Sequence, residues 1–171
     1  MKLFSTLLAA SVLLYTVVAC TAPSTPSVPN TPSKNAPATQ PVEPSDADLK
    51  ALAKSYASFA ALNTDLKVSP THQGMLVRTH LDAAATQAYN SKSYPFPDGA
   101  TAVKEAHKSA ESPTEALFVM KKIKGYDTAN GDWYYAMTAP DGTAMQKGKV
   151  QMCISCHSQA KAKDYIYGFN Q

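Results

Sequence analysis

A helical face of apolar residues follows Ser45. Leu49, Leu52 and Tyr56 recur at the three- to four-residue spacing that places side chains on one side of an amphipathic helix. Ser45 itself is a suitable helix cap, because an acidic residue three positions later can return the hydrogen bond. The pattern therefore predicts a helix over residues 46–62.

After Pro70 the pattern changes to short alternating runs, separated by turn clusters such as Pro140-Asp141-Gly142. One alanine-rich segment interrupts the runs, and a helical segment follows the last turn cluster. Short strands joined by tight turns and flanked by helices are typical of an α+β fold with a mainly antiparallel sheet. The predicted strands cover 74–81, 100–108, 115–124, 132–138 and 165–169, and the further predicted helices cover 82–90 and 149–160.

The first 19 residues are predicted to be a signal peptide. A basic second residue precedes an apolar run, over 3–18, that is too short for a comfortable membrane span. The run ends in Val17-Val18-Ala19-Cys20, which resembles the bacterial lipobox, where the cysteine is lipidated and becomes the mature N-terminus. We therefore expect a lipid anchor on Cys20. The alternative is an ordinary signal peptide cut after Ala19 or Ala22.

Residues 20–45 are predicted to be an extended linker. Between Thr21 and Pro44 there are seven prolines and seven serines or threonines, with almost no large apolar side chain. Such a segment cannot bury a core and stays extended. The expected organisation is thus a lipidated tether, or in the alternative a glycosylated stalk, that carries a folded domain over 46–171.

Composition narrows the possible partners. The formal net charge of the 171-residue chain is only +3, so nucleic-acid binding is not indicated. Of the three cysteines, one is assigned to the anchor, which leaves two for the chemistry of the folded domain.

Those two cysteines lie in the run Cys153-Ile154-Ser155-Cys156-His157, which has the C-x-x-C-H pattern of covalent haem attachment. Thiols three positions apart share one side of a helical turn, so both can add to the vinyl groups of one porphyrin. The next histidine then falls beneath the iron as an axial ligand. Two alternatives are a thioredoxin-like redox pair, which needs a βαβ context, and half of a zinc site, which needs two more ligands.

The position of the motif is informative about the kind of haem protein. In common electron-carrier cytochromes the motif comes early and a methionine tens of residues later takes the sixth position. Here any such methionine has to come from upstream. The candidates are Met75, Met120, Met137 and Met145. The many turns in the middle of the chain also argue against the four-helix bundle of the cytochromes c′.

The stretch from about Arg78 to Gly168 resembles the cytochrome P-460 family, which includes the cytochromes c′-beta. Three sequence blocks carry the resemblance and occur in family order. They are Phe96-Pro97-Asp98-Gly99-Ala100-Thr101-Ala102-Val103-Lys104-Glu105, then Gly125-Tyr126-Asp127 through Asn130-Gly131-Asp132-Trp133-Tyr134-Tyr135, then the C-x-x-C-H motif. The resemblance implies an antiparallel sheet with helices, a C-terminal haem-binding helix and usually a homodimer. It also implies one covalent haem c held by Cys153, Cys156 and His157, with the opposite iron face open to nitric oxide or hydroxylamine.

Lys104 matches the family's lysine that bonds covalently to the haem edge. Strand alternation places it on one face with Ala102 and Ala106, which leaves room for a flat ring. Desolvation there would lower its pKa and free the amine as a nucleophile. The alternative is a surface lysine that pairs with Glu105 or with a haem propionate.

The hydroxylamine-oxidising members also place a carboxylate over the open iron face. The stretch expected to match, residues 116–119, is apolar around Leu117, with Glu115 nearby. Because hydroxylamine oxidation must shed protons, an apolar wall favours neutral diatomic ligands.

Three functions remain open from the sequence: a nitric-oxide-binding haem protein with five-coordinate iron, a hydroxylamine-oxidising oxidoreductase with a lysine–haem cross-link, and a membrane-tethered electron-transfer cytochrome. Each would be exported and lipid-anchored to a bacterial membrane. A basic set of side chains that could steer an acidic redox partner supports the third function. Its members are Lys121, Lys122, Lys124, Lys147, Lys149, Lys161 and Lys163.

Overall fold

The structure is a computed structural model that describes residues 40–168. The predicted signal peptide, Cys20 and most of the predicted linker lie outside the described residues. Among the described residues, none of the helices has the length and apolar character needed to cross a membrane.

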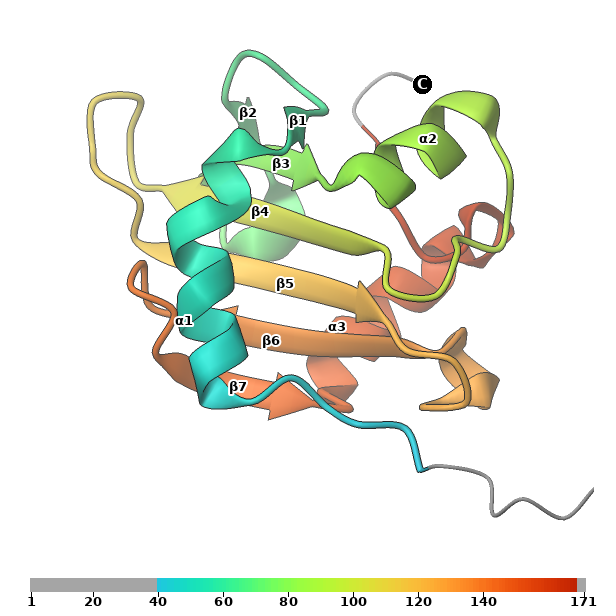
Figure 1. The fold of residues 1–171 in the computed structure, drawn as a ribbon. Helices are drawn as coiled ribbons and strands as arrows, with labels where there is room; N and C mark the ends of the chain where they lie inside the picture. The colour runs from blue at the N-terminus through green and yellow to red at the C-terminus, as the bar shows by residue number, and fades with distance from the viewer. Residues whose placement is uncertain (1–39, 169–171) are drawn as a thin grey trace, which may run out of the picture. The chain divides into compact units, whose positions relative to one another are not determined.

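The domain is built on one antiparallel sheet (Figure 1). Its strands follow the order β1-β3-β4-β5-β6-β7, and β2 also pairs with β3. The central strands alternate between the two faces, as the sequence predicts. The strands of the described part are β1 (Ala60–Ala61), β2 (Lys67–Val68), β3 (Leu76–Leu81), β4 (Thr101–His107), β5 (Ala116–Lys122), β6 (Trp133–Thr138) and β7 (Ala144–Gly148).

Helices cover both faces of the sheet, so the predicted α+β class is confirmed. Helix α1 crosses one face, while α3 lies on the opposite face (Figure 1). The helices and 3₁₀ turns are α1 (Asp46–Ser55), η1 (Tyr56–Ser58), η2 (Pro70–His72), α2 (Ala83–Ser91), η3 (Thr128–Asn130), α3 (Gln151–His157) and η4 (Ser158–Lys163).

Helix α1 starts where the sequence predicts and ends earlier. Ser45 and Asp48 form a reciprocal capping box, in which each side chain accepts a hydrogen bond from the other residue's backbone N–H. The predicted continuation to residue 62 is wrong. Tyr56 donates a 2.9 Å hydrogen bond to buried Glu105, and after a 3₁₀ turn the chain pairs with β3 as strand β1.

The two faces of the sheet carry separate cores. One core lies under α1, and the other lies under α2 and α3. They are separate because successive side chains along a strand point to opposite faces of the sheet. The α1 side buries Leu49, Tyr56, Val103, Leu117, Val119, Tyr126, Tyr134 and Ala136. The α3 side buries Leu81, Ala85, Ala88, Phe96, Ala100, Ala102, Met120, Trp133, Tyr135, Ile154, Tyr165 and Ile166.

The predicted final strand over 165–169 does not form in its described part. Asp164 and Tyr165 adopt left-handed φ angles of 49° and 70°, which break an extended run. The backbone carbonyl of Asp164 instead accepts a 2.9 Å hydrogen bond from Trp133 Nε1, and the segment packs into the core. Strands β1 and β2, by contrast, form where no strand is predicted.

Candidate haem site

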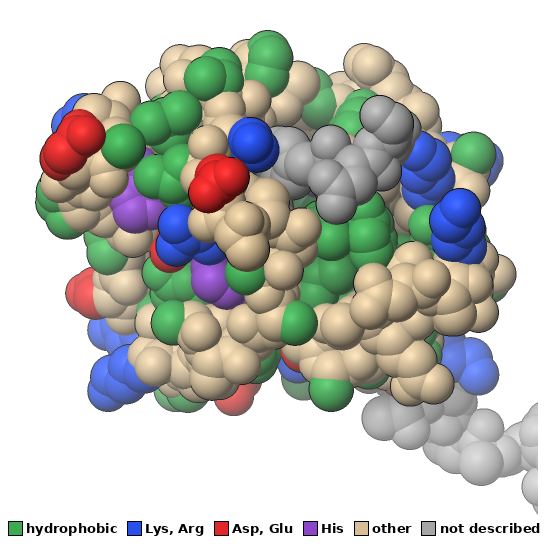
Figure 2. Space-filling view, turned by 90° about the horizontal axis from the view of Figure 1, so that it is seen from above, with side chains coloured by type: hydrophobic (Ala, Val, Ile, Leu, Met, Phe, Trp, Pro, Cys, Tyr) green, Lys and Arg blue, Asp and Glu red, His purple; other side chains and the backbone are tan. Residues whose placement is uncertain are grey.

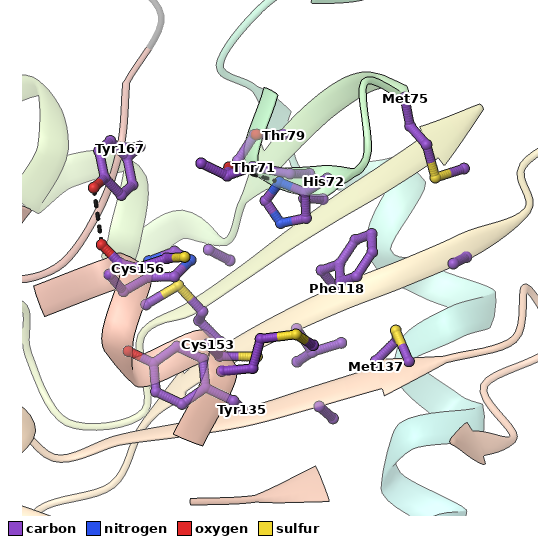
Figure 3. A pocket seen from close by; sticks show the side chains of 18 of the residues that line it. Thr71, His72, Met75, Thr79, Phe118, Tyr135, Met137, Cys153, Cys156 and Tyr167 are labelled. Atoms are coloured by element: carbon purple, nitrogen blue, oxygen red, sulfur yellow. Dashed lines mark hydrogen bonds between the residues drawn. The ribbon is translucent and has the colours of Figure 1, made fainter. Parts of the chain in front are cut away.

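A cavity of about 380 Å³ lies on the α3 side of the sheet. Its floor is formed by β4, β5 and β6, and its walls come from α3, from the η2 loop and from the segment after η4. Apolar side chains predominate, and several are methionines (Figure 3). The lining includes Thr71, His72, Met75, Thr79, Ala102, Lys104, Ala116, Phe118, Met120, Tyr135, Met137, Met145, Met152, Cys153, Cys156, His157 and Tyr167.

Helix α3 brings the predicted attachment residues to this cavity. Cys153 and Cys156 are one turn apart, and both line the cavity as free thiols, followed by His157 at the last helical residue. Burial, together with the neighbouring Cys156, raises the pKa of the Cys153 thiol. The structure therefore places all three residues of the motif on one wall of one cavity.

The imidazole of His157 is held by a backbone carbonyl. Its Nδ1 lies 2.7 Å from the oxygen of Tyr165, so Nδ1 carries the proton and Nε2 retains its lone pair. Tyr135 and Tyr167 flank the ring at centroid distances of 5.5 and 5.6 Å. Burial lowers the pKa of His157 to about 4, an effect that Lys104 increases and that the bond to Tyr165 opposes. The ring is thus neutral and oriented as a nitrogen donor.

A buried ion pair fixes the carbonyl that holds His157. Lys122 Nζ lies 2.8 and 2.6 Å from the two carboxylate oxygens of Asp164, and it also donates a 2.6 Å bond to the carbonyl of Gly131. Asp164 in turn accepts a 2.7 Å bond from the backbone N–H of Phe96. Because Asp164 immediately precedes Tyr165, this network supports the histidine through the backbone. The sequence does not predict this pair.

Lys104 lies on the cavity floor, as the alternation predicts. On β4 it is opposite Thr79 of β3 and Phe118 of β5, and all three line the cavity. Burial lowers the pKa of Lys104 to about 8. Lys104 therefore lines the same cavity as the motif and is partly buried.

The predicted apolar stretch 116–119 contributes Ala116, Phe118 and Val119 to the cavity lining, but not Leu117. Leu117 is only 1 % exposed and belongs to the core under α1. Glu115 pairs with Lys108 at 2.9 Å and is not among the residues that line the cavity. Within this stretch of β5, Leu117 thus belongs to the opposite core, and Phe118 presents its ring to the cavity.

His72 is a site residue that sequence analysis missed. It lies on η2, and Figure 3 shows it beside Phe118, on the side of the cavity away from Cys153 and Cys156. The rings of His72 and Phe118 meet edge to face at 4.5 Å. A lone histidine in a loop has no motif spacing that would mark it as a site residue. The one local signal is Ser69, three positions earlier, whose hydroxyl lies 2.8 Å from His72 Nδ1.

The four candidate methionines, together with Met152, also line the cavity. Met120 is buried in the core, whereas Met145 and Met152 are 51 % and 64 % exposed. The cavity is therefore rich in soft, adaptable side chains that suit a large flat ligand.

The residues of the cavity fit a haem better than the alternatives. An antiparallel sheet gives the motif no βαβ context, and residues 40–168 contain no cluster of three or more His, Cys, Asp or Glu side chains able to hold a metal ion. An oriented histidine, two adjacent thiols and an apolar cavity satisfy the needs of a covalently attached porphyrin. When bound, haem supplies an iron centre for ligand binding or electron transfer, and Cys153, Cys156 and His157 would hold it.

Fold and site together define a c-type haem protein. The family model described as Cytochrome P460 matches residues 53–168, which is more than half of the chain and includes the whole cavity. The chain belongs to the cytochrome P460 family. No curated protein matches it.

Proposed function

We propose that this protein is an exported mono-haem cytochrome whose iron is ligated by His157 and binds a small molecule, such as nitric oxide, on its opposite face. The observation that carries the proposal is the 2.7 Å hydrogen bond from His157 Nδ1 to Tyr165, made inside the cavity that also holds both thiols. It leaves Nε2 as the nitrogen available to iron.

The side chains on the ligand side of the cavity favour the binding of small uncharged molecules. Phe118 and Met137 face each other across neighbouring strands and present carbon and sulfur to the cavity. Such a wall excludes water and favours a diatomic molecule over a hydrated ion. The carboxylate nearest in sequence, Glu115, is paired elsewhere.

The test has two parts. In Cys153→Ala and in Cys156→Ala, acidic organic solvent should extract haem from the protein. The wild-type protein should keep all of its haem under the same treatment. The reduced wild type should then bind nitric oxide with one-site stoichiometry. Full covalent retention in both single variants, or a reduced protein that takes up no nitric oxide, would overturn the proposal.

Hydroxylamine oxidation is the second candidate, and Lys104 is the observation that favours it. Its amine lies in the cavity with a pKa lowered to about 8 by burial, which increases its neutral, nucleophilic fraction near neutral pH. A lysine in this position suits a cross-link to the haem edge. The lysine can, however, mark the family without the activity, because no carboxylate is among the described residues that line the cavity.

Steady-state turnover separates these two candidates. We expect slow or absent hydroxylamine oxidation by the wild type with an artificial electron acceptor, and no further loss in Lys104→Ala. Rapid turnover that disappears in Lys104→Ala would make the protein an enzyme and reverse the ranking.

Electron transfer has weaker support, because the basic set does not form one surface. Lys122 is buried against Asp164, and Lys147 pairs with Asp46. On the face seen in Figure 2, acidic and basic side chains are interspersed. Steering of an acidic redox partner would thus depend on the remaining lysines.

Export and anchoring are proposed from Cys20 and the linker alone. Cys20→Ser should release the protein from the membrane fraction into the soluble fraction. Unchanged membrane association would point to an uncleaved anchor. A homodimer remains a proposal from family membership, and the molar mass in solution tests it.

A further inference from the structure

His72 occupies a position in the cavity that no proposed role yet uses. Its 3₁₀ turn, η2, connects β2 to β3 and brings the ring over the cavity, edge to face with Phe118. Figure 3 shows His72 and Phe118 on one side and the cysteine-bearing helix on the other. A flat group attached to that helix would therefore have His72 on its far side.

Local hydroxyl groups orient the His72 ring. Ser69 Oγ lies 2.8 Å from Nδ1, and Thr71 Oγ1 lies 3.3 Å from the same nitrogen. A hydroxyl can donate to Nδ1, and Ser69 is itself buried, at 5 % exposure. When Nδ1 accepts, the ring proton resides on Nε2, the nitrogen on the other side of the ring. In the tautomer whose Nδ1 accepts from these hydroxyls, the turn presents an N–H donor.

The surroundings keep this ring neutral. Burial lowers the pKa of His72 to about 3, with Lys104 and His157 adding to the effect. A neutral imidazole can donate one hydrogen bond without bringing a full charge into an apolar cavity. The His72 side of the cavity thus combines the apolar ring of Phe118 with a neutral imidazole.

We propose that His72 donates a hydrogen bond to the ligand bound at the open iron face. The site would therefore favour ligands that carry negative charge on an outer atom over neutral poor acceptors. This proposal rests on the proposed function, because it needs an open iron face. The ligand class is small nitrogen or oxygen species that accept electron density from iron, such as bound nitroxyl or dioxygen. Hydrogen bonds to charged acceptors are the stronger ones, so the donor discriminates among diatomic molecules of equal size.

Carbon monoxide on the reduced protein is a spectroscopic probe of this donor. A hydrogen bond at the outer oxygen draws electron density into the ligand and weakens the C–O bond. His72→Leu should therefore raise the C–O stretching frequency. His72→Gln, which keeps an N–H donor, should remain near the wild type, and Ser69→Ala should fall between, because Nδ1 is then freer to hold the proton.

Azide on the oxidised protein gives an independent readout. The loss of one hydrogen bond to an anionic ligand should weaken azide binding by about tenfold to a hundredfold in His72→Leu, with most of the affinity kept in His72→Gln. His107→Gln is the matched control, because His107 approaches Glu105 on the other face of β4 and does not line the cavity. It should leave both readouts unchanged.

The outcomes separate this proposal from the one it rests on. Unchanged C–O frequency and azide affinity in His72→Leu, with nitric oxide still bound, would overturn the donor role and leave the proposed function intact. A reduced wild type that is six-coordinate and becomes five-coordinate only in His72→Leu would make His72 an iron ligand and end both proposals. A wild type that binds neither probe nor nitric oxide would also end both.

Discussion

Two lysines on neighbouring strands face the same side of the sheet in different surroundings: Lys122 is buried and Lys104 is partly buried. Lys122 is sealed between Trp133 and the C-terminal segment, where Asp164 and the carbonyl of Gly131 surround its ammonium group. Lys104 lies on the floor of the cavity, and burial lowers its pKa to about 8.

The difference separates a structural charge from a chemically available one. A carboxylate stabilises the charged form of Lys122, so that residue can tie the C-terminal segment to the sheet and hold the carbonyl that orients His157. Burial beside a cavity disfavours the charged form of Lys104 and so increases the neutral fraction of its amine. The same residue type thus serves opposite purposes within one sheet face.

The largest effect is expected from Lys122→Met. The change leaves the carboxylate of Asp164 buried without its cation, which typically costs about 3–5 kcal/mol in the free energy of unfolding. Urea unfolding of the haem-loaded protein measures this loss. Because Asp164 supports Tyr165, the electronic spectrum should also report a disturbed histidine ligand.

Lys104→Met is the matched control for this prediction, since it makes the same change on the adjacent strand. It should cost less stability than Lys122→Met, because burial disfavours the charged form of Lys104, whereas a carboxylate stabilises that of Lys122. Equal losses of unfolding free energy in Lys122→Met and Lys104→Met would contradict the distinction between the two lysines.

An intermediate effect on the free energy of unfolding is expected from the titration of Lys104 with pH. The pKa of Lys104 is about 8 in the folded protein and about 10.5 when unfolded, so between these values the unfolded chain binds more protons. The contribution of Lys104 to the free energy of unfolding should therefore rise with pH between these two pKa values, by at most about 1.4 kcal/mol per pH unit. The difference in unfolding free energy between wild type and Lys104→Met, measured from pH 7.5 to 11, isolates this effect. A difference that stays constant with pH would show that the pKa of Lys104 is not lowered.

The smallest effect is expected from Lys147→Met. Lys147 also pairs with a carboxylate, that of Asp46, but in an exposed position where water screens the interaction. The unfolding midpoint of Lys147→Met in urea should match that of the wild type within experimental error. A loss as large as that of Lys122→Met would mean that burial is not what distinguishes the three lysines.

Local patterns predicted the parts of the site that are local in sequence. The thiols and His157 share one helical turn, and the alternation of β4 is enough to place Lys104 on the cavity face. By contrast, Lys122 and Asp164 are 42 residues apart, so their pairing depends on how the C-terminal segment folds back. No spacing rule carries that information.

Two errors show where local reasoning fails for a physical reason. Helix α1 ends early because Tyr56 finds a buried partner on β4, a tertiary contact that overrides the helical periodicity. The apolar wall predicted over 116–119 includes Leu117, which alternation sends to the opposite core, while Phe118 lines the cavity. His72 was missed because a single loop histidine becomes meaningful only when the fold brings it over the site.

The visible absorption spectrum of the reduced, ligand-free protein tests the central claim most directly. With His157 as the one protein ligand and an open opposite face, we predict a five-coordinate high-spin spectrum that changes on addition of nitric oxide. A six-coordinate low-spin spectrum, as His72 or one of the cavity methionines would produce by binding the iron, would contradict the account.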